Sequence, residues 1–356
     1  MDKKPIISIV VAAYGVVEYL SEAIDSVISN ENWDEYSELI IVNDGSTDGT
    51  TSLLKAYEEK INSRRFIVIN QKNAGLSAAR NSGLAVATGE YVSFLDGDDF
   101  IVENGLKYVK YCLEENKPDC LIVDFNYYWD DGGMHETHKY KGLKQRKLLN
   151  VIEDNVLSAV YHNMQAYAWR HIFKRSILEK RLSPIGYNYE DIRTVPLHIN
   201  ECETVYYLPI KYIQYRQRSG SIMSVKNIKN ILDLSSSLRT VTDELKQLYP
   251  TMPKDIALEH SIFNLYIFTW SCGDTLSNHE LKPEELYSKF VENFDYSNLV
   301  DFSLLKSTMR RDPKNWRKFI VFYKYPKLFY LAFYLRHNFN KVYKLLNKVR
   351  ELVYKI

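Results

Sequence analysis

The sequence predicts an α/β fold with a mostly parallel sheet flanked by helices, followed by a helical C-terminal region. Apolar, β-branched runs alternate four times with amphipathic segments within the first 100 residues. This alternation requires parallel strands joined by right-handed crossovers. From Asn227 to about Lys306 the apolar residues instead recur at helical spacing, without an internal repeat.

The alternating elements follow one another in a regular order. Residues 6–12 form a continuous β-branched run, which is typical of a buried parallel strand. The other expected strands are 39–42, 66–69, 91–95 and 120–129. The expected helices are 16–29, 47–60, 77–87, 101–115, 228–248 and 256–270. The 55 residues after the turn at 130–133 show no regular pattern.

Charge divides the chain more clearly than composition does. The 356 residues carry a formal net charge of +1, which argues against a nucleic-acid-binding protein. Residues 310–356, however, hold thirteen Lys or Arg and two acidic residues, so residues 1–309 carry −10. We therefore expect three regions: an α/β domain at 1–225, a helical region at 226–310, and a basic, aromatic, amphipathic helical tail at 311–356.

The tail has an apolar stripe at heptad-like spacing from residue 328 onward, with lysines on the opposite face. We expect it to bind the surface of an anionic membrane; a homo-oligomer seam and packing against the body are the alternatives. The sequence has neither a signal-peptide pattern nor a run of 18 uncharged apolar residues. We expect a cytoplasmic protein that is peripheral on the inner face of the cell membrane.

Polar residues follow three of the expected strands, at 12–15, 43–46 and 96–99. In open α/β sheets ligands bind outside the carboxyl ends of the strands, so these loops are expected to form one site. Two of the loops are acidic, and an acidic crevice accepts a diphosphate only with a divalent cation. Carboxylate oxygens suit Mg²⁺ or Mn²⁺. The alternative for 96–99 is a tight turn in which Asp99 caps the next helix.

Four segments, 8–14, 41–50, 73–83 and 94–99, resemble in order and spacing the signature of family 2 glycosyltransferases, which have the Rossmann-like GT-A fold. The resemblance covers about residues 5–225. It implies an inverting transferase that takes a sugar from a nucleoside diphosphate with the help of Mn²⁺ or Mg²⁺. The chain departs from the family pattern at Ala12, where the family usually has Pro, and at Gly15, where it usually has Asn.

The resemblance also implies roles for individual residues. Asp98 would be the main metal ligand, with Asp96 touching the metal or the ribose. The donor would be bound by Ala12, Tyr14, Asp44, Asn73, Arg80, Asp96, Arg216, Arg218, Ser219 and Ser221. Of these, Asp44 would bind uracil, whereas Arg216 and Arg218 would bind phosphate oxygens from a segment that closes over the diphosphate. The alternatives are an Asx turn at Asp44, a surface ion pair at Arg80 and a plain surface loop at 215–224.

On the acceptor side, a hydroxyl group is a poor nucleophile, so a carboxylate must take its proton. Asp191 would be this base, while Glu190 would orient it or bind the acceptor; alternatively both are acids at a helix start. A sugar could stack on Trp169, although a core position suits this residue nearly as well.

We expect a UDP-sugar donor and, as acceptor, a hydroxyl of a lipid-linked or protein-linked glycan. The alternatives are a non-catalytic scaffold that binds nucleotide or glycan, and a nucleotidyltransferase.

Overall fold

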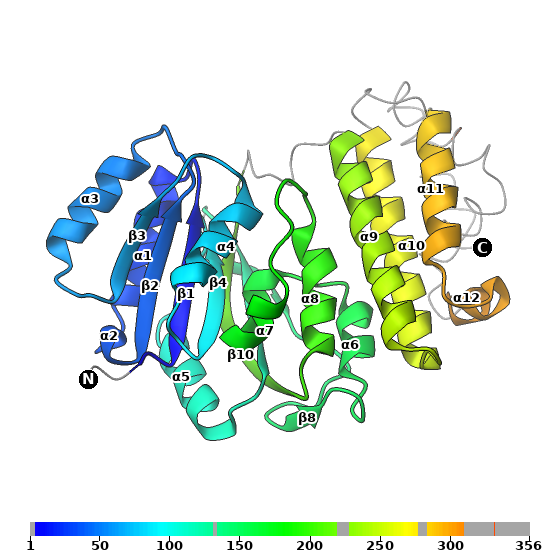
Figure 1. Cartoon of the computed structure of the whole chain (residues 1–356), viewed down its shortest axis with the longest axis horizontal. Helices are drawn as coiled ribbons and strands as arrows, with labels where there is room; N and C mark the ends of the chain where they lie inside the picture. The colour runs from blue at the N-terminus through cyan, green and yellow to red at the C-terminus, as the bar shows by residue number, and fades with distance from the viewer. Residues whose placement is uncertain (1–3, 131–133, 219–227, 277–282, 310–330, 332–356) are drawn as a thin grey trace. The chain divides into compact units, whose positions relative to one another are not determined.

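The computed structural model describes residues 4–130, 134–218, 228–276, 283–309 and 331 (Figure 1). The chain divides into two compact units, residues 1–219 and 220–356. The predicted boundary at 225/226 and, except for residue 331, the predicted tail at 311–356 lie outside the described residues.

The first unit is built on a ten-stranded sheet in the order β3-β2-β1-β4-β9-β6-β10-β5; in addition β7 pairs with β6 and β8 with β10. The strands are β1 (Ile7–Ala13), β2 (Ser37–Asn43), β3 (Phe66–Asn70), β4 (Tyr91–Asp96), β5 (Phe100–Ile101), β6 (Cys120–Trp129), β7 (Met134–His138), β8 (Leu148–Asn150), β9 (His171–Lys174) and β10 (Thr204–Gln217).

The sheet is more mixed than the sequence suggests. The four expected strands β1 to β4 pair in parallel, and so do β6 and β10. Four short strands, β5, β7, β8 and β9, instead pair antiparallel with their neighbours β4, β6 and β10. These strands have two to five residues, too few for their alternation to stand out from a loop. The α/β prediction is confirmed, whereas most of the strands and helices in the region 134–217 were not predicted from the sequence.

The helices of the first unit are α1 (Val17–Ile28), α2 (Trp33–Tyr36), α3 (Thr50–Lys60), α4 (Leu76–Val86), α5 (Gly105–Asn116), α6 (Val156–Asn163), α7 (Arg175–Lys180), α8 (Glu190–Asn200) and the 3₁₀ turn η1 (Ala168–Arg170). Alternate residues of β1 face opposite sides of the sheet. Ile9 packs in a core that includes Leu20 of α1, whereas Val10 faces α4. A Cβ on Gly83 of α4 would lie 2.3 Å from Val10 Cγ1, so this glycine lets α4 approach the sheet closely.

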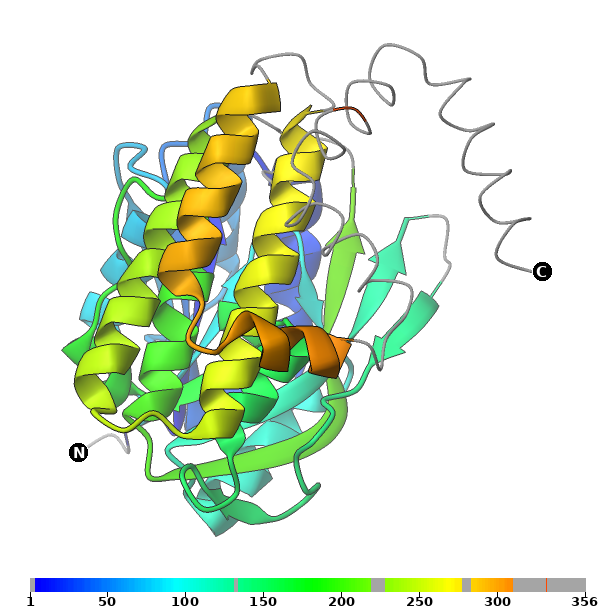
Figure 2. The ribbon, with the colours of Figure 1, turned by 90° about the vertical axis from the view of Figure 1, so that its right-hand side faces the viewer.

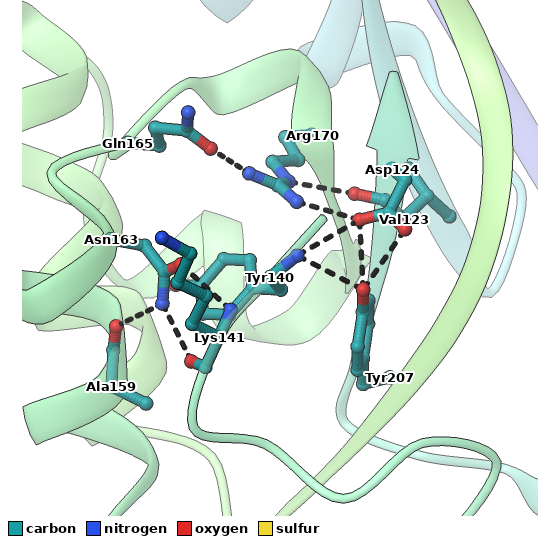
Figure 3. Close-up of polar contacts among 9 residues, drawn as sticks. All are labelled: Val123, Asp124, Tyr140, Lys141, Ala159, Asn163, Gln165, Arg170 and Tyr207. Carbon is teal, nitrogen blue, oxygen red and sulfur yellow. Dashed lines mark hydrogen bonds and ion pairs between the residues drawn. The ribbon is translucent and has the colours of Figure 1, made fainter. Parts of the chain in front are cut away.

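A buried polar network joins the two long strands β6 and β10 to the irregular segments around them (Figure 3). Arg170 donates to Val123 O at 2.7 Å, to Asp124 Oδ1 at 2.8 Å and to Gln165. The Tyr207 hydroxyl lies 2.9 Å from Asp124 Oδ2. Arg170 is 0% exposed, so a buried ion pair holds this part of the unit together.

The second unit is helical over its described residues, as the sequence predicts. It contains α9 (Ile228–Leu248), α10 (Lys254–Leu276), α11 (Pro283–Ser297) and α12 (Phe302–Met309). Figure 2 shows α9, α10 and α11 side by side, and each of them contacts the other two. Among the helices that the structure describes, none combines the length and the apolar character needed to cross a bilayer.

Candidate functional site

The loops after β1, β2 and β4 meet at the carboxyl edge of the parallel strands, as expected (Figure 1). Asp44 N donates to Ala13 O at 2.9 Å, and Gly97 N donates to Ala12 O at 3.0 Å. Ala12 is therefore beside both acidic loops. Tyr14 follows at the tip of the first loop, where its side chain is 59% exposed.

The carboxylate of Asp44 organises the segment before α4. It accepts hydrogen bonds from Ala74 N at 3.0 Å, from Gly75 N at 2.8 Å and from the Gln71 side chain at 2.7 Å. Asp44 is 2% exposed. Its carboxylate thus accepts hydrogen bonds that hold the segment before α4 in place. The contact of Asp44 with uracil stays a prediction. Gln71 was not among the predicted site residues, because nothing in the sequence marks a glutamine 27 positions away as its partner.

Close packing brings the second loop against the segment of Asn73. Gly45 has φ +75°, and a Cβ at this position would lie 2.7 Å from Asn73 N. Glycine is therefore required both for the backbone conformation and for the contact. The side chain of Asn73 is exposed beside this contact, at the edge where the donor is predicted to bind.

The loop after β4 concentrates negative charge. Asp99 is buried, its Oδ1 accepts from Arg216 N at 2.8 Å, and its Oδ2 has no hydrogen-bond partner among the described residues. Burial, together with Asp96 and Asp98, raises the pKa of Asp99 well above its usual value. Burial and Asp96 likewise raise the pKa of Asp98, although Arg218 opposes the shift. The loop therefore carries negative charge that the protein only partly compensates.

Two arginines at the end of β10 contact this loop in different ways. Arg218 Nε donates to Asp98 Oδ2 at 2.7 Å, so its guanidinium offsets part of the charge of the predicted metal ligand. Arg216 Nε donates to Asp98 O at 2.9 Å, while its other nitrogens pair with Glu22 and Asp130.

Aromatic rings also surround the Arg216 guanidinium. Its carbon lies 4.9 Å from the ring centres of Tyr19 and Tyr128 and 5.5 Å from that of Phe100. Arg216 is buried and fully engaged, so binding phosphate would require it to exchange partners. Ser219 and Ser221 lie outside the described residues.

Arg80 joins the acidic loop to the predicted acceptor side. Its Nη2 donates to Asp96 Oδ1 at 2.8 Å, and its Nη1 donates to Glu190 Oε1 at 2.7 Å. Burial disfavours the guanidinium charge, but Asp96, Glu190 and Asp191 outweigh it and raise the Arg80 pKa. The surface ion pair considered for Arg80 is wrong, because the residue as a whole is 3% exposed and its ion pairs are buried.

Asp191 stands in the first turn of α8, beside Glu190. Its Oδ1 accepts from Ile192 N at 2.8 Å, and its side chain remains partly exposed. Burial and the Glu190 charge raise the pKa of Asp191, and Arg80 only partly offsets them. A carboxylate with a raised pKa is a stronger proton acceptor, which is what a general base for a hydroxyl group needs.

Trp169 belongs to a cluster of aromatic side chains inside the first unit. Its ring stacks on Tyr167 at 4.8 Å with an interplanar angle of 9°, and it contacts Phe125 at 4.8 Å and Tyr215 at 5.2 Å. It is 4% exposed. The described contacts are those of a core residue, the alternative considered from the sequence, and stacking against a sugar stays a prediction.

The donor groups at the edge fit a divalent cation only in part. Within the stretches that the structure describes, no three acidic, His or Cys side chains gather closely enough to hold a metal. Asp96 and Asp98 nevertheless supply two carboxylates with incompletely compensated charge. Mg²⁺ is commonly held by one or two carboxylates together with substrate phosphates, and these two residues fit that arrangement.

The sequence of the first unit matches a known family. Residues 8–181 match the family described as Glycosyl transferase family 2. The chain is 29% identical over 235 residues to the glycosyltransferase GlyA of Streptococcus pneumoniae, covering 62% of this chain and 32% of GlyA. It is 28% identical over 229 residues to the uncharacterized glycosyltransferase EpsJ of Bacillus subtilis, covering 62% and 64%. The resemblance drawn from the four motifs is confirmed.

A longer match is to the minor teichoic acid biosynthesis protein GgaB of Bacillus subtilis. The two are 33% identical over 288 residues, which is 80% of this chain and 31% of GgaB. The chain spans about a third of the length of GlyA and GgaB, and less than two thirds of EpsJ.

Solved structures share the fold. Residues 1–349 of Staphylococcus aureus TarS, in complex with UDP-GlcNAc, superpose with a TM-score of 0.55 at 16% identity, covering 82% of this chain and 90% of that one. The mannosyltransferase PcManGT of Pyrobaculum calidifontis, in complex with GDP-Man and Mn²⁺, gives a TM-score of 0.50 at 15% identity, covering 95% and 88%. The expected GT-A fold is confirmed.

Proposed function

Residues 8–181 match glycosyl transferase family 2, and from this premise we propose that the chain transfers a sugar from a UDP-sugar to a hydroxyl of a lipid-linked or protein-linked glycan. The transfer inverts the anomeric carbon and depends on Mn²⁺ or Mg²⁺. The observation that carries the proposal is the contact of Arg80 with both Asp96 and Glu190. It links the acidic loop suited to a diphosphate with the acids suited to an acceptor.

In the proposed reaction the acceptor oxygen attacks C1 of the sugar while the bond from C1 to the diphosphate breaks. Asp191 takes the proton of the hydroxyl as the new bond forms. Its raised pKa and partial exposure support this role. Glu190, buried against Arg80, supports the geometry of the pair.

The donor would lie along the carboxyl edge of β1, β2 and β4, beside Ala12, Tyr14, Asp44, Asn73 and Asp96. The TarS structure in complex with UDP-GlcNAc has the same fold, which supports a UDP-sugar as the donor. A bound Mn²⁺ or Mg²⁺ would offset the charge that develops on the departing diphosphate. Asp98 and Asp96 are the residues that would hold it.

Arg218 would turn from Asp98 to the phosphate oxygens when the donor binds. Its side chain reaches the acidic loop and is partly exposed, which supports such an exchange. Ser219 and Ser221 would supply hydroxyl groups to the phosphates, and Arg216 would anchor the end of β10.

One relative and the tail sequence bear on the glycan acceptor and the cellular location. The match to a minor teichoic acid biosynthesis protein favours a role in teichoic acid biosynthesis. We keep the proposal that residues 311–356 hold the protein on the inner face of the membrane, with a homo-oligomer seam as the alternative.

A panel of nucleotide sugars tests this function without knowledge of the acceptor. The protein is incubated with UDP-glucose, UDP-galactose, UDP-GlcNAc and GDP-mannose in the presence of Mn²⁺, and release of the nucleoside diphosphate is compared with mixtures lacking protein. Slow hydrolysis of a UDP-sugar is expected. UDP binding without release would favour the scaffold, and pyrophosphate release from UTP and a sugar phosphate would favour a nucleotidyltransferase.

A further inference from the structure

One arginine connects two parts of the site that are far apart in sequence. Arg80 lies 16 residues before Asp96 and 110 residues before Glu190, and it binds both. Its planar guanidinium offers parallel donors, and two different carboxylates occupy its Nη1 and Nη2. Its side chain is 4% exposed.

These contacts disagree with a direct role in donor binding. Both terminal nitrogens of Arg80 are already engaged by carboxylates, and the Phe94 ring centre lies 5.6 Å from its guanidinium carbon. A ligand for phosphate needs accessible donors. Arg80 instead faces the interior between α4, the end of β4 and the start of α8.

The helix that carries Arg80 is fixed in its position. Ser77, Ala78 and Ala79 are buried, and Gly83 packs directly on Val10 of β1. Arg80 therefore extends from a helix that is held against the sheet. Its position determines where the carboxylates of Asp96 and Glu190 lie.

We propose that Arg80 is a positioning residue that fixes the start of α8 relative to the acidic loop, through Glu190 on one side and Asp96 on the other. Asp191, the next residue along, is thereby held at a set place relative to the donor. Glu190 is then the partner of Arg80 rather than the base or an acceptor ligand. This inference rests on the proposed function and assigns roles within it to Arg80 and Glu190.

The second carboxylate supports this division of roles. Glu190 is buried and accepts a hydrogen bond from Arg80, whereas Asp191 is partly exposed and, among the residues that the structure describes, forms no ion pair with Arg80. Of the two carboxylates, Asp191 is therefore the one that is open to an acceptor and not hydrogen-bonded to Arg80. A misplacement of about 1 Å in such a group can cost a rate factor of about 10².

The test uses steady-state kinetics of the full chain on the donor found in the panel. Arg80→Lys keeps a positive charge but not the two-pronged geometry. We expect kcat to fall about 10²-fold, with the donor KM and the UDP Kd changed by less than about threefold. Arg64→Lys, at an exposed arginine on the loop before β3, is the matched control and should leave all three unchanged.

Glu190→Gln provides a second variant that keeps the shape and an acceptor oxygen for Arg80. We expect it to lose no more than about tenfold in kcat, against a loss of about 10²–10⁴ for a missing general base. Thermal unfolding of each variant shows that it is folded. If Arg80→Lys does not fold, the Glu190→Gln result decides alone.

Three results would overturn the inference. A raised KM and UDP Kd with unchanged kcat in Arg80→Lys would make Arg80 a donor ligand. Kinetics like those of the wild type would make its role purely structural. A loss in Glu190→Gln as large as that of a missing base would make Glu190 the base. An inactive wild type, by contrast, overturns the proposed function itself.

Discussion

Replacing Arg170 by Met should destabilise the first unit strongly, because it leaves Asp124 as a buried carboxylate without its counter-ion. Both side chains are buried, and the Nη2–Oδ1 distance is 2.8 Å. Burial raises the pKa of Asp124 and lowers the pKa of Arg170, so desolvation opposes both charges and the pairing compensates for it. Removing one partner of such a pair costs about 3–5 kcal/mol of unfolding free energy.

Some hydrogen bonds of the network survive the substitution and others are lost. Asp124 keeps the Tyr207 hydroxyl at 2.9 Å and Tyr140 N at 3.2 Å, but Val123 O and Gln165 lose their donor. At roughly 2–4 °C per kcal/mol for a unit of this size, the melting temperature should fall by roughly 6–20 °C.

Urea unfolding, followed by circular dichroism and tryptophan fluorescence, measures the change. Arg64→Met is the control, since an exposed arginine should cost less than about 0.5 kcal/mol. In Arg170→Met the pKa of Asp124 rises further above its value in the unfolded chain. The folded variant then gains stability from proton binding as the pH falls toward about 4, so its deficit should be smaller at pH 5 than at pH 8. A loss below about 1 kcal/mol, or a deficit that grows on acidification, would refute the argument.

Two further changes act at the carboxyl edge. Gly45→Ala should weaken UDP binding by about tenfold or more, because a Cβ 2.7 Å from Asn73 N must displace that segment; unchanged affinity in calorimetry would separate the loop from the donor site. In wild type, UDP should bind more tightly with Mn²⁺ than in EDTA, and Asp98→Ala should remove the difference, since its carboxylate is the proposed ligand of the cation. Equal affinity in EDTA, or a metal effect that survives in Asp98→Ala, contradicts the metal assignment.

The sequence predicted those strands and helices that depend on patterns among neighbouring residues. Strands β1 to β4 and the helices α1, α3 and α4 between them were predicted within a few residues, because continuous apolar runs and helical spacing involve neighbouring positions; the four-residue helix α2 was missed. Strand β10 was missed: it is irregular between Leu208 and Ile213, and this breaks the alternation that a strand normally shows. The strands β8 and β9 were missed because three or four residues carry too little pattern.

The site was predicted as a set of residue types rather than as a set of contacts. The motif 96–99 and the pair 190–191 identified the acids, but no local pattern shows that Arg80 joins them across 110 residues. Likewise, the two arginines near 216 look equivalent in sequence. Only the fold shows that Arg216 pairs with Glu22, 194 positions away, whereas Arg218 reaches Asp98.

The most direct test of the central claim compares wild type with Asp191→Asn on the donor identified by the panel. Asp191→Asn should bind UDP as wild type does while transferring about 10²–10⁴ times more slowly, since it removes the base and leaves the donor site intact. The wild-type rate should fall on acidification, because the base must be ionised. Since the pKa of Asp191 is raised, this fall should occur at a higher pH than the pKa of about 4 of an ordinary aspartate. Wild-type turnover by Asp191→Asn would contradict the account.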